Sequence, residues 1–160
     1  MGLFSKLFSK DSKEPESNEN NINKESQIKQ MTQFWIGNFA TEEISSNFFQ
    51  EIYNENDDDS PLSEFIETQN EQWLDHDFME DHHFKIKSEV RKNLYSYSEN
   101  KDWLIKFDEM FRDFNENGNF TLVMSSYDFP SLNNKVKSPQ SFNSNEITLI
   151  YFGEIKSPFM

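Results

Sequence analysis

The chain has 160 residues, no cysteine and a formal net charge of −14, so its length is that of one domain and its charge balance is strongly acidic. The lack of cysteine excludes disulfides and thiolate metal sites and is typical of a reducing compartment, so we expect a cytoplasmic protein. No run approaches 18 consecutive apolar residues, and the sequence therefore predicts no membrane-spanning helix.

Residues 1–30 read as a tail in front of the domain. Residues 10–30 contain no aromatic residue and are rich in Ser, Asn, Glu and Lys, so they cannot bury enough apolar surface to offset the entropy lost on ordering. We predict a disordered or linker-like tail over 1–30 and a domain over 31–160. The apolar side chains of residues 1–10 share one helical face and could make weak contact with a membrane, although we favour a frayed terminus.

The first elements of the domain follow from short apolar patterns. Phe34-Trp35-Ile36 predicts a strand that ends at a Gly37-Asn38 turn. Thr41 is a suitable N-cap for a helix that runs to about residue 53, because apolar residues recur after it with helical spacing. Pro61 suits the first turn of a second helix.

The middle of the chain is less regular. Residues 71–84 mix aromatic and acidic side chains without a clear period, and we leave them unassigned. Helical spacing predicts a short helix over 86–94 and a longer one over 97–115, before which Ser96 and Glu99 have the spacing of a capping box.

Two apolar runs near the end of the chain predict strands. They cover 120–124 and 147–152, and the second is apolar on both faces, which favours a place inside the sheet. A loop rich in Pro, Ser and Asn separates them over 128–145. Helices and strands are mixed without a βαβ alternation, so we predict an α+β fold: a single domain with a small, mainly antiparallel sheet and helices packed on it.

The negative charge is concentrated in one part of the chain. Residues 31–85 carry fourteen carboxylates and a single lysine, a net charge of −13, whereas residues 1–30 are neutral and residues 86–160 carry −1. Such a segment repels nucleic acid and anionic lipid and attracts a basic surface. Aromatic residues are interleaved with the acids, a mixture that favours a protein-binding surface over a merely solvated face.

Motifs for catalysis or cofactor binding are weak. The four glycines are isolated, so no phosphate-binding loop is predicted. Residues 113–118 match the first half of a calcium loop, but the twelfth position is Met124 instead of the required glutamate, and we interpret the segment as a helix-terminal turn. We therefore predict no catalytic residues, no metal and no cofactor.

All three histidines lie between residues 76 and 83, among aspartates. Such side chains could bind a transition metal or act as general acid and base, which would make residues 75–83 the site of a metal-dependent hydrolase. His82 and His83 are adjacent, however, and adjacent side chains point in different directions on any regular element. We favour a polar loop.

The chain resembles immunity protein family 22 of bacterial polymorphic toxin systems over residues 31–153. The resemblance begins with the opening strand Phe34-Trp35-Ile36-Gly37-Asn38-Phe39 and the acidic helix start Thr41-Glu42-Glu43. It continues in Asp59-Ser60-Pro61, in the Asp/Phe-rich stretch 73–80, in Ser96-Tyr97-Ser98-Glu99 and in the late apolar strand. The resemblance implies a protein without catalytic residues that neutralises a cognate toxin by stoichiometric binding.

We therefore expect the partner to be a toxin domain that is basic, for example a nuclease, with no direct binding of nucleic acid. The alternative is a chaperone or adaptor of a secretion system, since such a protein would also be acidic and would also act by binding another protein. Candidate partner-binding residues are eight of the acids and one tryptophan of the charged segment: Asp57, Asp58, Asp59, Glu71, Trp73, Asp75, Asp77, Glu80 and Asp81.

Overall fold

The computed structural model describes residues 29–53, 56, 62–98 and 101–156. Its centre is a five-stranded antiparallel sheet with strand order β2-β3-β1-β5-β4. The predicted tail lies almost entirely outside the described residues, and the first strand begins two residues earlier than the predicted domain. The strands are β1 (Lys29–Phe39), β2 (Met79–Ile86), β3 (Asn117–Phe129), β4 (Phe142–Asn143) and β5 (Ile147–Lys156).

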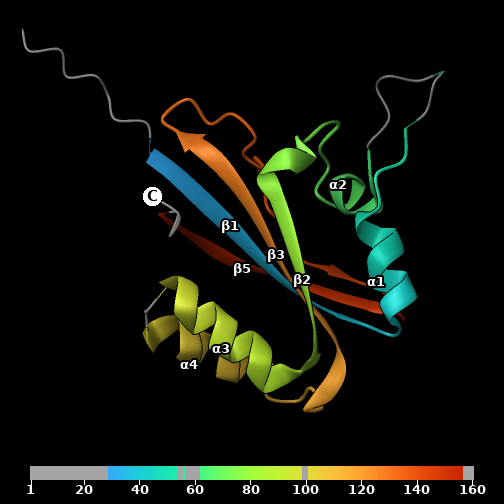
Figure 1. Cartoon of the computed structure of the whole chain (residues 1–160), viewed down its shortest axis with the longest axis vertical. Coiled ribbons are helices and arrows are strands. Elements are labelled where there is room, and N and C mark those ends of the chain that lie inside the picture. Colours follow the sequence, from blue (N-terminus) through green and yellow to red (C-terminus); the bar gives the residue numbers. More distant parts are fainter. Residues whose placement is uncertain (1–28, 54–55, 57–61, 99–100, 157–160) are drawn as a thin grey trace, which may run out of the picture.

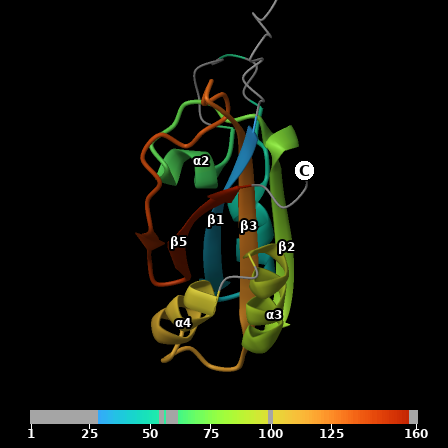
Figure 2. The same ribbon diagram turned by 90° about the vertical axis from the view of Figure 1, so that its left-hand side faces the viewer.

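Helices cover both faces of the sheet. Figure 1 shows α3 and α4 on one face of the sheet and α1 and α2 on the other, where each pair packs against its own core cluster. Figure 2 shows the strands spread side by side, with β2 along one margin. This arrangement confirms the predicted α+β class. The helices are α1 (Glu42–Phe49), α2 (Glu64–Thr68), the 3-10 turn η1 (His76–Phe78), α3 (Lys87–Ser98) and α4 (Lys101–Met110).

The alternation of side chains along β1 divides the core in two. Phe34 and Ile36 face α3 and α4, where they join a cluster that includes Phe107 of α4. Trp35 and Phe39 point to the opposite face and pack in a second cluster with side chains of α1 and α2. Because β1 is buried on both faces, its apolar run is continuous, as in a central strand.

Gly37 and Asn38 lie inside β1, so the predicted turn is wrong at this position. The tripeptide Gly-Asn-Phe occurs again at 118–120 in β3, and the two copies pair antiparallel, with Asn38 opposite Phe120 and Phe39 opposite Asn119. A Cβ at Gly37 would lie 2.4 Å from Cε2 of Phe39. The glycine is therefore needed because the ring of Phe39 folds back across it.

Several predicted boundaries differ from the structure. The first helix has the predicted Thr41 N-cap but ends at Phe49, and Ile52 is exposed. The helix expected over 97–115 is α4, residues 101–110, and Ser96 lies within α3, where its hydroxyl donates to the carbonyl of Asn93 instead of capping α4. The strand expected over 120–124 extends over the whole of β3.

The unassigned segment 71–84 contains η1 and most of β2, and the loop over 128–145 contains β4. Two glutamine side chains hold this loop, because the amide group of each bonds to both the N–H and the C=O of one loop residue, as a neighbouring strand would. Gln33 donates to the carbonyl of Val136 (3.1 Å) and accepts from its N–H (3.0 Å). Gln69 makes the same pair with Gln140, at 3.2 and 2.8 Å.

The segment 113–118 connects α4 to β3. Its polar groups take part in contacts at the end of α4 and at the start of α3. The Nζ of Lys87 donates to the carbonyls of Phe111 and Phe114, beyond the last turn of α4. The carboxylate of Glu116 accepts from the N–H of Ser88 at the start of α3. Hydrogen bonds from the side chain and from the backbone N–H of Ser88 lower the pKa of Glu116. Gly118 already belongs to β3.

Candidate protein-binding surface

A pocket of about 230 Å³ opens where the segment after α1 meets the segment before β2. Two stretches far apart in the sequence form it, within residues 51–53 and residues 73–77. Leu62, which lies between these stretches in the sequence, also lines it. Three carboxylates and two exposed aromatic rings surround the opening. We call this site the acidic–aromatic pocket, and its lining is Glu51, Tyr53, Leu62, Trp73, Leu74, Asp75, His76 and Asp77.

Glu51 organises the inner wall of the pocket. One oxygen of its carboxylate lies 3.2 Å from Nδ1 of His76, and the other accepts a hydrogen bond from the hydroxyl of Tyr53. The same bond raises the pKa of Tyr53, because it is lost when the phenol ionises. His76 is only 14% exposed, and its buried Nε2 has no hydrogen-bond partner among the described residues.

The outer wall of the pocket is apolar and exposed. Trp73 is 59% exposed and Tyr53 is 73% exposed. Ile52, next to Tyr53 in the sequence, and Phe78, next to Asp77, are exposed as well. Asp75 uses one carboxylate oxygen to accept the N–H of Asp77 at the start of η1, which fixes the loop that carries both acids. Large aromatic residues are normally buried, so two on one rim mark a surface suited to contact with another molecule.

The charge of the acidic–aromatic pocket is one-signed. The described residues that line it include three carboxylates and no lysine or arginine. A cation that enters would meet the carboxylates and the faces of two aromatic rings, both of which attract an ammonium or guanidinium group. Lys137 is not part of this lining; together with Trp73 it lines a separate hollow.

The predicted candidate residues divide into four groups. Asp57, Asp58 and Asp59 lie outside the described residues. Trp73, Asp75 and Asp77 come together at the acidic–aromatic pocket. Glu80 and Asp81 lie on β2. Glu71 does not join them, because its 9% exposed carboxylate accepts the N–H of Lys137 and pairs with its ammonium group. Glu51 and Tyr53 were not predicted from the sequence, because they lie about twenty positions before Trp73 and join it only through the fold.

His82 and His83 lie on a strand and not on the predicted loop, and they point to opposite faces of it. His82 pairs with Glu80 at 3.4 Å on the face toward α3. His83 pairs with Asp81 at 2.8 Å on the face toward α1. Since His76 turns to Glu51, the three histidines do not converge. No group of three or more His, Asp or Glu side chains within the described ranges is placed to hold a metal ion.

Asp81, His83, Thr121 and Ser45 form a chain of polar contacts with the order of a hydrolase triad. Nδ1 of His83 lies 3.1 Å from the Thr121 hydroxyl and 3.5 Å from that of Ser45. Both hydroxyls are buried, however, and they bond to each other at 2.7 Å. A substrate carbonyl could not reach either oxygen, so this network serves to fasten α1 to the sheet.

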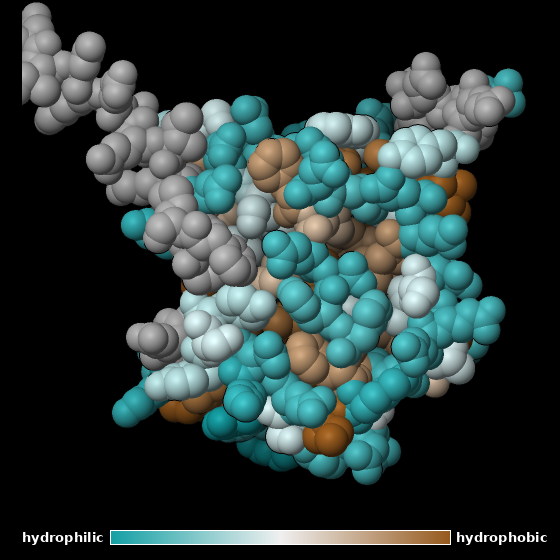
Figure 3. Space-filling view, viewed as in Figure 1, coloured by the Kyte–Doolittle hydropathy of each residue, from teal (hydrophilic) through white to brown (hydrophobic). Residues whose placement is uncertain are grey.

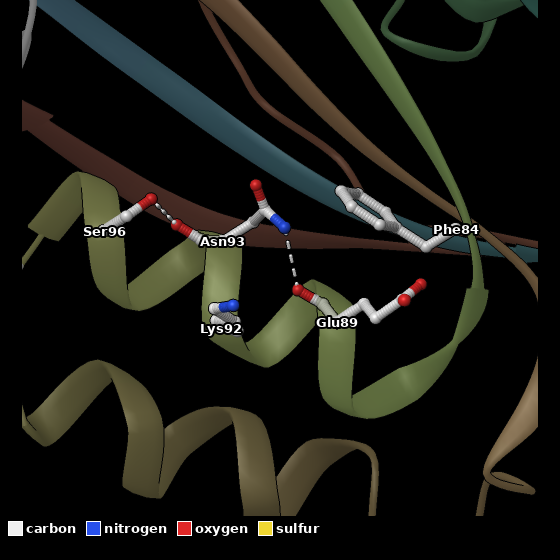
Figure 4. Close-up of a pocket in the computed structure, with 5 residues that line it drawn as sticks. All are labelled: Phe84, Glu89, Lys92, Asn93 and Ser96. Atoms are coloured by element: carbon white, nitrogen blue, oxygen red, sulfur yellow. Dashed lines mark hydrogen bonds between the residues drawn. The ribbon is translucent and has the colours of Figure 1, made fainter.

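Another hollow, of about 390 Å³, lies between β2 and α3 (Figure 4). The ring of Phe84 forms one side, and Glu89, Lys92, Asn93 and Ser96 of α3 form the other. Asn93 and Ser96 donate to carbonyls of their own helix. The hollow therefore offers an apolar ring flanked by one acid and one base, with no constellation for catalysis.

Comparison of the chain with protein-family models, with curated proteins and with solved structures gives no match. Among the described helices, none is long and apolar enough to cross a membrane.

Proposed function

We propose that this protein neutralises a bacterial toxin by stoichiometric binding, and that the acidic–aromatic pocket contacts a basic region of the toxin domain. The observation that carries the proposal is the pairing of exposed Trp73 and Tyr53 with three carboxylates and no lysine or arginine. Aromatic residues and arginine are enriched at protein interfaces, and a basic side chain would meet complementary charge and two ring faces here.

The charge and the rings have separate roles in this proposal. A one-signed acidic surface steers a basic partner and raises the association rate by roughly 10- to 1,000-fold, an effect that salt screens. Trp73, once covered, would slow dissociation, because buried aromatic residues at the centre of an interface hold most of the binding energy. A toxin that acts on nucleic acid has a basic site, and an acidic inhibitor suits it for the same electrostatic reason.

The experiment measures association and dissociation with the toxin domain encoded beside this protein, in low and high salt. Asp75→Asn with Asp77→Asn should lower the association rate and flatten its salt dependence, whereas Trp73→Ala should mainly raise the dissociation rate. Glu109→Gln on α4, a neutralised exposed acid on the far face of the sheet, is the matched control and should change neither.

Unchanged rates in both pocket variants would overturn the proposed site. The function itself would be overturned if the neighbouring gene encoded no toxin and the protein instead bound a secreted substrate or a secretion component, as a chaperone or adaptor would.

A further inference from the structure

No described strand pairs with the outer edge of β2. β2 is the last strand in the sheet order, and among the described strands β3 is its single neighbour. Figure 2 shows it along the margin of the sheet, and in Figure 1 it lies in front of the other strands. A strand at an edge presents a row of unpaired N–H and C=O groups, which are a template for pairing with another extended chain.

The side chains of β2 carry acid on both faces of this edge. Glu80 faces α3, where its charge adds to the effect of burial in raising the pKa of Tyr97. Asp81 faces α1, and both carboxylates are about half exposed. In the surface view of this side of the molecule, most residues are hydrophilic, with apolar residues visible between them (Figure 3).

The hollow between β2 and α3 adjoins the same edge. Phe84 belongs to β2 and forms the apolar wall of the hollow. When a strand adds to a sheet edge, main-chain hydrogen bonds hold it, and pockets beside the edge receive its alternate side chains. A strand added to β2 would direct every second side chain toward Phe84 and the others toward Asp81.

We propose that β2 binds an extended segment of a partner protein by strand addition, and that this segment alternates apolar residues with lysine or arginine. The apolar side chains enter the hollow beside Phe84, and the basic ones lie against Asp81. A second copy of this chain is a poor occupant, because its β2 would bring carboxylates against carboxylates. The inference goes beyond the proposed function, since it holds for any partner with such a segment.

The test uses the full chain and an eight-residue peptide of alternating lysine and valine with blocked ends. The peptide should bind, and it should slow hydrogen exchange of the β2 amides that point away from β3 by at least about tenfold. The same peptide with every backbone nitrogen methylated keeps the charge and the side chains but has no N–H donors, and it should bind at least about tenfold more weakly.

Asp81→Lys should weaken binding of the lysine–valine peptide by about fivefold or more, whereas Glu109→Lys on α4 should leave it unchanged. Equal binding of the methylated peptide would overturn strand addition, because charge alone would then explain the affinity. The inference would fail as well if the peptide bound without protecting β2, or if it protected residues 73–77 instead.

Discussion

The ring of Phe39 lies where a side chain at Gly37 would have to be, and this allows a sharp test of how the opening strand is packed. In Gly37→Ala the new methyl group would lie 2.4 Å from Cε2 and 3.0 Å from Cζ of Phe39, so the buried ring must move. Overpacking of this kind costs about 1–3 kcal/mol. Alanine recovers about 0.5–1 kcal/mol of strand propensity over glycine. The expected net loss of folding free energy is about 0.5–2 kcal/mol.

For a chain of this length, each kcal/mol lowers Tm by about 2–4 °C, so thermal unfolding followed by circular dichroism should show a decrease of about 1–8 °C. Phe39→Leu removes the ring atoms that clash. In that background Gly37→Ala should become neutral or slightly stabilising, which makes the coupling between the two sites about 1–3 kcal/mol. Additive effects within about 0.5 kcal/mol would refute the steric explanation.

Three further predictions follow from polar contacts. Gln33→Leu leaves both backbone groups of buried Val136 without their partner and should cost about 2–4 kcal/mol in denaturant unfolding, whereas a loss below 1 kcal/mol would mean that the loop is held elsewhere. Arg91 lowers the pKa of Asp108, so their pair stabilises above about pH 4 and is lost as pH falls through that lowered pKa; Asp108→Asn should lower Tm slightly at pH 7 but not near pH 2. Replacing His76, His82 and His83 together with alanine should leave the metal content, measured by mass spectrometry, unchanged. Stoichiometric zinc in the unaltered protein that disappears in this variant would instead support a metalloenzyme.

The sequence predicted elements best where burial imposes a period. The run 34–36 and the apolar run 147–152 are buried strands, and α4 has a regular apolar stripe, so all three were visible. β2 was not, because an edge strand with half-exposed histidines and acids has neither a hydrophobic alternation nor a continuous apolar run. Gly37 was misread because glycine usually marks a turn, whereas here a ring two residues away requires it.

The candidate site could be predicted only in part. Trp73, Asp75 and Asp77 are close in sequence, so their charge and aromatic character were visible together. Glu51 and Tyr53 reach the same pocket through the tertiary fold, which composition cannot reveal. Glu71 has the same chemistry as its acidic neighbours, and only the structure shows that its carboxylate is already bonded to Lys137.

The most direct test of the proposed function is a titration of toxin activity. The proposal expects a toxin domain encoded beside this protein, and that domain is assayed at a concentration far above the dissociation constant, with increasing amounts of the present protein. We expect a linear loss of activity that is complete at one equivalent, whereas the combined Trp73→Ala, Asp75→Asn and Asp77→Asn variant should be needed in large excess. Full toxin activity at a large excess of the unaltered protein, or inactivation by much less than one equivalent, would contradict neutralisation by stoichiometric binding.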